Sequence, residues 1–203
     1  MNIFRRNSSS NYCSAIHCAS INPNQEILES LLKNFPNYNI ADSLGRKPIH
    51  YAAAVADSAG NMETLLRHAS DLKDLDKQKM TPLMIACYYG RSHIVRYILD
   101  KFNEPLYVNF KSDEGLAALH YAVLNNHEEC VSTLVSYIVV EINTETKDKQ
   151  TALHLAAGLG NTTIIQTLLT HGAYVDYYDR CKRTPFMFAL RNNNYEAFRM
   201  LMN

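Results

Sequence analysis

Apolar residues recur along this chain in pairs that lie one helical turn apart, with polar residues on either side. The sequence shows this in Ile27-Leu28 with Leu31-Leu32, in Ile94-Val95 with Ile98-Leu99, and in Ile164-Ile165 with Leu168-Leu169. Spacings of three and four residues place such side chains on one face of a helix. In four units a shorter apolar segment precedes the stripe and ends on Gly90, Asn126, Gly160 or Asn193, residue types that suit a left-handed helix end. The pattern therefore predicts pairs of short antiparallel helices.

The predicted helix pairs repeat at a nearly constant interval. The segment Thr151-Ala152-Leu153-His154 has counterparts that begin at Ser14, Lys47, Thr81, Ala117 and Thr184, so the intervals are 33, 34, 36, 34 and 33 residues. Three of the counterparts have Pro second, which suits the first turn of a helix because the amide that Pro lacks has no partner there. A period this regular is typical of a solenoid, in which each unit buries its apolar stripe against the next.

These motifs closely resemble the ankyrin repeat. Its pattern is a turn of the form Asp-x-x-Gly, then Thr-Pro-Leu-His-x-Ala-Ala, a Gly turn, and a second helix that ends in Leu-Leu. The resemblance covers residues 11–203 and implies an all-α solenoid of stacked antiparallel helix pairs with projecting hairpin loops. The six expected units are 11–41, 42–75, 76–111, 112–145, 146–178 and 179–203, after a flexible polar tail over 1–10.

Several positions depart from the repeat pattern. Gly60-Asn61 comes four residues late in the second unit, so we expect a shortened second helix or a remodelled turn, with an irregular loop over 55–61. Residues 102–115 form the longest expected connection. Lys79, Lys149 and Lys182 replace the turn glycine of three hairpins. Because a left-handed lysine costs on the order of 1 kcal/mol, we expect these three tips to be reshaped. The apolar ending of the last unit suggests that the array once continued beyond it, or that the chain is a fragment of a longer protein.

Composition narrows the classes of partner and the compartment. Lysine plus arginine equals aspartate plus glutamate, at 20 each, so the sequence does not indicate a nucleic-acid or anionic-membrane partner. The longest uncharged apolar run, near 134–140, is too short to span a bilayer. Five cysteines without a CxxC pair favour reduced thiols, and hence a cytoplasmic protein with the nucleus as the alternative.

The candidates for metal ligands or other chemical roles are four histidines. His17, His50, His120 and His154 occur once per repeat, so they form a ladder along the stack and do not converge as metal ligands must. The resemblance implies that each ties its hairpin to the neighbouring loop, and that Met84 and Met187 lose this tie. The sequence contains no Walker loop, no HExxH and no recognised nucleophile–histidine–acid order. We therefore expect no enzyme activity, no cofactor and no metal.

The resemblance also implies a partner-binding site on the concave side, built from hairpin tips and from the variable positions of the first helices. Carried over by position, these residues are Leu44, Arg46, Met80, Tyr88, Tyr89, Glu114, Leu116, Tyr121, Leu124, Asn125, Gln150, Leu159, Arg183 and Arg191. Tyr88, Tyr89 and Tyr121 suit the role of binding anchors because they are large and rigid. The alternative is that the residue directly after each histidine position (Tyr51, Ile85, Tyr121, Leu155 and Phe188) belongs to the core between repeats.

The expected function is a protein–protein interaction scaffold or adaptor that is monomeric by itself and binds another protein or peptide. The alternative is a regulatory or substrate-recruiting module of a kinase, phosphatase, ubiquitin ligase or channel, carried within a longer chain.

Overall fold

The structure is a computed structural model that describes residues 13–35, 37–55, 59–68 and 70–202. These residues form α-helices joined by turns and loops, and none of them lies in a β-strand. The expected all-α class is confirmed. The proposed tail over 1–10 lies outside the described residues.

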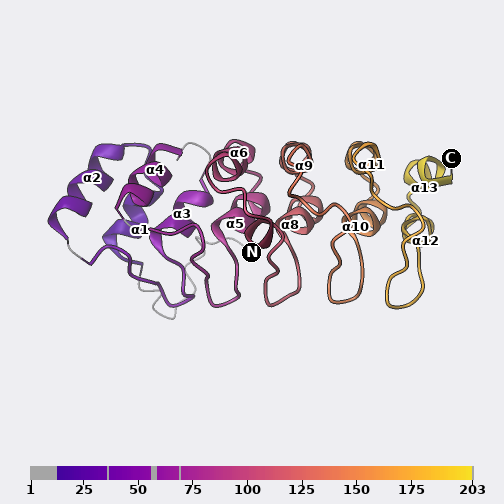
Figure 1. Cartoon of the computed structure of the whole chain (residues 1–203), viewed down its shortest axis with the longest axis horizontal. Helices are drawn as coiled ribbons and strands as arrows, with labels where there is room; N and C mark the ends of the chain where they lie inside the picture. The colour runs from indigo at the N-terminus through magenta and orange to yellow at the C-terminus, as the bar shows by residue number, and fades with distance from the viewer. Residues whose placement is uncertain (1–12, 36, 56–58, 69, 203) are drawn as a thin grey trace.

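Among the described residues, six helix pairs follow one another, and their first and second helices form two layers (Figure 1). The first helices are α1 (Ala15–Ser20), α3 (Pro48–Ala53), α5 (Pro82–Tyr88), α8 (Ala118–Leu124), α10 (Ala152–Leu159) and α12 (Pro185–Arg191). The second helices are α2 (Gln25–Asn34), α4 (Ala59–Arg67), α6 (Ser92–Lys101), α9 (Glu128–Val135), α11 (Thr162–Thr170) and α13 (Tyr195–Met202). Hairpin loops project in a row beyond the first helices, as Figure 1 shows. The expected solenoid is therefore confirmed.

One continuous core runs through the stack between neighbouring units. The stripe residues Ile94, Ile98, Ile165 and Leu168 are completely buried. The small pairs Ala52-Ala53 and Ala156-Ala157 are also buried, and side chains of this size let neighbouring helices approach closely. Because each unit covers the apolar face of the next, the fold depends on contacts between neighbours and not on one central core.

Of the two alternatives expected for the second unit, the shortened helix is wrong, and the longer connection between the helices agrees with the remodelled turn. Helix α4 begins at Ala59, contains Gly60 and Asn61, and has nine residues, so it is not shortened. The extra length lies in the connection, where five residues separate α3 from α4 and only two separate α10 from α11. The Asn61 amide donates from this helix to the carbonyls of Ser20 and Asn22, at 3.2 and 2.7 Å. The expected irregular loop is therefore wrong for residues 59–61, and residues 56–58 lie outside the described residues.

The three lysine hairpins keep the glycine geometry, so the expected reshaping is wrong. Lys79, Lys149 and Lys182 have φ of 57°, 60° and 58°, beside 76° at Gly45 and 79° at Gly115. Each lysine amide donates across its tip, to the carbonyl of Asp76, Thr146 or Asp179, as the Gly45 amide does to Asp42. These hydrogen bonds outweigh the cost of a left-handed lysine, which is about 1 kcal/mol.

The long connection after the third unit contains an additional helix, α7 (Pro105–Val108). Tyr107 and Val108 are buried, and the Tyr107 ring packs edge-on against Phe102 with centroids 4.9 Å apart. This insertion explains the interval of 36 residues. Within the described part of the chain, no helix combines the length and apolarity that crossing a membrane requires.

Candidate functional site

The first helices and the hairpin tips form one side of the molecule, which we call the first-helix face. Two positions per unit, four and five residues after the histidine position, lie one turn further along each first helix. At the end of α5 they hold Tyr88 and the C-cap residue Tyr89, both half-buried. In α8 and α10 they include Leu124 and Leu159, which are 39% and 49% exposed. We call these four residues the Tyr–Leu strip. Because α5, α8 and α10 are neighbours in the stack, the strip runs over three consecutive units.

The aromatic end of the strip is a small cluster of rings. Tyr88 and Tyr89 meet edge to face with centroids 5.0 Å apart, and Tyr88 meets Tyr121 in the same way at 6.1 Å. Edge-to-face contact holds the rings in a defined arrangement and adds to the energy of burial. The cluster therefore presents a rigid aromatic surface beside Leu124.

Tyr121 itself belongs to the core. It is only 5% exposed, and its hydroxyl lies 2.8 Å from the Ser112 hydroxyl of its own hairpin. Burial also raises the pKa of the Tyr121 phenol. Tyr51 has the same position in the second unit and donates to the Asp42 carboxylate at 2.8 Å. The expectation that Tyr121 is an exposed anchor for a partner is therefore wrong. Its ring instead supports the ring of Tyr88.

The alternative interpretation of the position after the histidine is confirmed in three units and not in the last two. Tyr51, Ile85 and Tyr121 are buried, whereas Leu155 and Phe188 are half-buried. The other candidate residues remain accessible to different degrees. Leu44, Glu114, Leu124, Leu159 and Arg191 are exposed, and Arg46, Met80, Tyr88, Tyr89, Leu116, Asn125, Gln150 and Arg183 are half-buried.

One candidate residue is held by its own hairpin. The Arg183 guanidinium donates to the Asp179 carboxylate at 2.7 and 2.9 Å and lies over the Phe188 ring, 4.8 Å from its centroid. This contact shows that the hairpin tips and the first helices share the same face. Arg183 is therefore positioned before any partner arrives.

The four histidines form the expected ladder of ties. Each Nδ1 accepts from a backbone amide three residues earlier, at 3.0–3.1 Å. Each Nε2 lies 3.0–3.1 Å from a carbonyl of the next hairpin, which belongs to Arg46, Asp74, Thr144 or Arg183. Since Nδ1 accepts, the ring proton sits on Nε2 and donates to that carbonyl. Burial lowers the pKa of all four imidazoles, and that of His120 to about 4.

The ladder positions do not converge on a metal site. Across the described ranges, no group of three or more His, Cys, Asp or Glu side chains could hold a metal ion. Met84 occupies the ladder position of the third unit and is buried, but its thioether has no N–H with which to tie the next hairpin.

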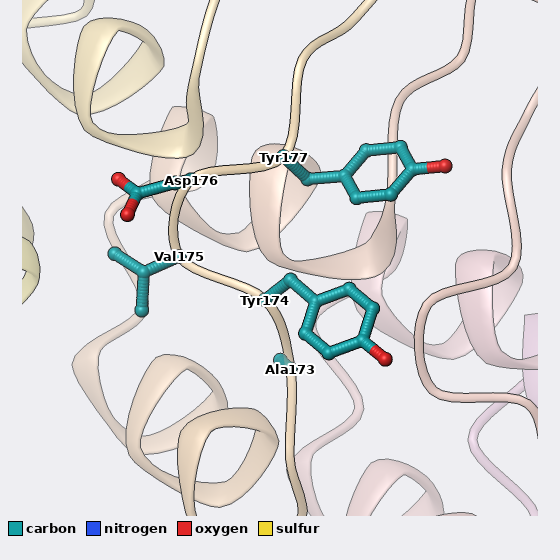
Figure 2. A pocket seen from close by; sticks show the side chains of 5 residues that line it. All are labelled: Ala173, Tyr174, Val175, Asp176 and Tyr177. Carbon is teal, nitrogen blue, oxygen red and sulfur yellow. The ribbon is translucent and has the colours of Figure 1, made fainter.

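Figure 2 shows a hollow beside the sixth unit that the sequence did not lead us to expect. It is lined by Ala173, Tyr174, Val175, Asp176 and Tyr177, a single segment of chain. The Tyr174 and Tyr177 rings lie nearly parallel, with an interplanar angle of 13° and centroids 6.2 Å apart, and the Tyr177 hydroxyl donates to Glu145. Polar groups from several elements do not converge here, as they do in sites for small molecules. The tyrosine-rich run Tyr174 to Tyr178 is the only signal in the sequence that could have indicated it.

Comparison with known proteins agrees with the geometry. A sequence model of the family "Ankyrin repeats (3 copies)" matches residues 53–145 and 132–203, and one for "Ankyrin repeats (many copies)" matches residues 16–66. The chain therefore belongs to the ankyrin-repeat family, whose repeat is a non-catalytic domain that generally mediates protein–protein interaction.

The similar proteins are varied and much longer. The poly [ADP-ribose] polymerase tankyrase of Caenorhabditis elegans is 31% identical over 186 residues, which cover 83% of this chain and 8% of that protein. Human inversin is 28% identical over 190 residues, covering 93% of this chain and 18% of inversin. Mouse Rabankyrin-5 is 30% identical over 172 residues, covering 83% of this chain and 14% of that protein. The chain thus spans less than a fifth of the relatives it matches.

Proposed function

We propose that this chain is a scaffold or adaptor module whose partner protein lies across the first-helix face and is anchored on the Tyr–Leu strip. The observation that carries the proposal is the row of apolar side chains that the stack leaves accessible. Leu124 and Leu159 are 39% and 49% exposed on consecutive units, and Tyr88 and Tyr89 extend the row to a third unit. Exposed apolar side chains gathered on neighbouring units are a feature of protein interaction sites.

The dimensions of the strip suit a polypeptide. Neighbouring helices pack about 8–10 Å apart, so a strip over three units is roughly 20 Å long. A partner segment of a few helical turns has this length, since a helix rises about 1.5 Å per residue. Tyrosine suits the contact because it offers a large amphipathic surface and loses little conformational entropy on binding.

The test is a double substitution of the two accessible tyrosines. Proteins retained by the immobilised chain from a native extract are identified, and the Tyr88→Ala, Tyr89→Ala variant is expected to lose its specific partner. Tyr174→Ala is the matched control, because Tyr174 is 60% exposed but lies outside the strip. Far-UV circular dichroism checks that each variant is folded. Retention of the same partner by a folded double variant would show that the strip is not the site.

We also propose that the chain acts as a monomer in the cytoplasm. The odd number of cysteines supports a reducing compartment, because all five can remain thiols there. Light scattering during size-exclusion chromatography is expected to give a mass near 23.1 kDa. Fluorescence imaging of the tagged protein tests the location, and accumulation in a secretory compartment would contradict it.

A further inference from the structure

Charge is unevenly distributed between the hairpin tips and the rest of the chain. We define the tips as residues 42–47, 76–81, 112–117, 146–151 and 179–184. They contain nine basic and six acidic residues, although the whole chain has 20 of each. The first-helix face is therefore bordered by a basic row, and the matching acidic excess lies elsewhere on the molecule.

Half of the acidic residues in the tips do not face outward. Asp42, Asp76 and Asp179 are buried, at 6%, 8% and 4% exposure. One oxygen of each carboxylate accepts two backbone amides of its own tip at 2.8–2.9 Å. These carboxylates therefore stabilise the turns and present little surface to a partner.

The outward charges are mainly cations. Six basic side chains in the tips are exposed (Lys77, Lys79, Lys147, Lys149, Arg180 and Lys182), against three acidic ones (Asp113, Glu114 and Asp148). Two of the three acidic groups already face a tip cation: Lys79 lies 2.8 Å from Asp113, and Arg180 lies 4.0 Å from Asp148. The surplus of positive charge beside the Tyr–Leu strip thus remains after the internal pairs are counted.

We infer that the partner segment is acidic: a polypeptide in which aspartate or glutamate residues flank aromatic or aliphatic side chains. The apolar side chains fill the Tyr–Leu strip, while the carboxylates face Lys77, Lys149 and Lys182 across the solvent-exposed rim. This inference rests on the proposed function and specifies the chemistry of its partner. Complementary charge at a rim contributes chiefly to association rate and specificity, and it makes binding dependent on salt.

A nucleic acid fits the surface less well than an acidic polypeptide. Asp113, Glu114 and Asp148 interrupt the basic row, and they would face a phosphate backbone that needs continuous positive charge. The two accessible tyrosines pack edge to face on each other, with an interplanar angle of 67°, so their faces are not set out as successive stacking platforms for bases.

The test uses a displayed library of random 15-residue peptides panned on the immobilised chain. Peptides that need Tyr88 and Tyr89 are expected to be enriched in Asp and Glu next to aromatic or aliphatic residues. Synthetic copies are then titrated against the variant Lys77→Glu, Lys149→Glu, Lys182→Glu, which should bind about tenfold more weakly, since each exposed pair contributes modestly. The same peptides should weaken several-fold when the salt concentration is raised.

The matched control is Lys33→Glu, Arg96→Glu, Lys101→Glu, which makes the same change of charge on α2 and α6. It is expected to change the affinity less than about twofold. If the tyrosine-dependent peptides are neutral or basic, the inference of an acidic partner is wrong, while the Tyr–Leu strip is still supported as the binding site. The absence of tyrosine-dependent peptides would overturn both. Tighter binding of a random-sequence oligonucleotide than of any peptide, at equal salt, would also overturn the inference.

Discussion

The buried imidazole of the ladder histidine His120 should make the stability of the stack depend on pH. It is completely buried, accepts from the Ala117 amide at 3.1 Å, and lies 3.1 Å from the Thr144 carbonyl. Burial lowers its pKa to about 4 from an ordinary value of 6.5. Between these two values the unfolded chain binds the proton and the folded chain does not. The stabilisation is therefore complete above pH 6.5 and is lost as the pH falls to about 4, by about 3 kcal/mol in all.

Substitution by methionine isolates this contribution. Met84 and Met187 occupy the same position in two other units, and Met84 is 1% exposed, so the side chain fits the slot. His120→Met leaves the Ala117 amide and the Thr144 carbonyl without the imidazole. An unsatisfied buried polar group costs about 1–3 kcal/mol, so we expect the free energy of unfolding near neutral pH to fall by roughly 2–4 kcal/mol.

Urea denaturation followed by far-UV circular dichroism measures both effects. From about pH 7 to about pH 5, the native protein should lose about 2 kcal/mol more than His120→Met, because only the native protein has this imidazole to protonate on unfolding. His93→Gln is the control, since His93 is exposed on α6 and should change the free energy of unfolding by less than about 0.5 kcal/mol. Equal losses in the native protein and His120→Met would refute the reasoning.

Three further substitutions test the turns and caps, each by urea denaturation. Gly172→Ala places a side chain at φ 88° with no atom within 4 Å, so only backbone strain acts, and the free energy of unfolding should fall by about 1 kcal/mol. Lys149→Gly relieves the same strain at φ 60° and should raise the free energy of unfolding by about 0.5 kcal/mol. A decrease would show that the left-handed lysine is not strained. Asn161→Ala removes the side-chain cap of α11, the 2.9 Å hydrogen bond from the Ile164 amide, and should lower the free energy of unfolding by about 1–2 kcal/mol. An unchanged free energy of unfolding would show that this cap does not stabilise the helix.

The repeat and the left-handed ends of its first helices could be predicted because they depend on local spacing. Asn126 and Asn193 were expected to end their helices in the left-handed conformation, and they do so with φ of 61° and 58°. Such helix ends need only helical geometry, which neighbouring residues in the chain already define. The histidine ties were expected only from the resemblance to the ankyrin repeat, since their carbonyl partners lie 24 or 29 residues further along the chain.

Two local expectations failed because hydrogen bonds outweighed propensity, within one tip in the first case and between segments in the second. Lys149 keeps the left-handed turn because its amide is hydrogen-bonded within the tip. Asn61 is drawn into α4, where its side chain bonds the carbonyls of Ser20 and Asn22 in the preceding unit. The sequence around Gly60 and Asn61 does not reveal those carbonyls, since about 40 residues separate the partners.

The chain's periodic pattern of apolar, small and turn residues determined by itself that this protein is a stack of six helix pairs, because helical spacing assigns each apolar residue to a face. Only the tertiary structure decided which variable side chains reach solvent. Tyr88 and Tyr121 both lie on first helices, yet Tyr121 is buried, with its hydroxyl 2.8 Å from that of Ser112, while Tyr88 remains accessible. Burial at such positions depends on the neighbouring unit and on the hairpin opposite, which no local pattern encodes.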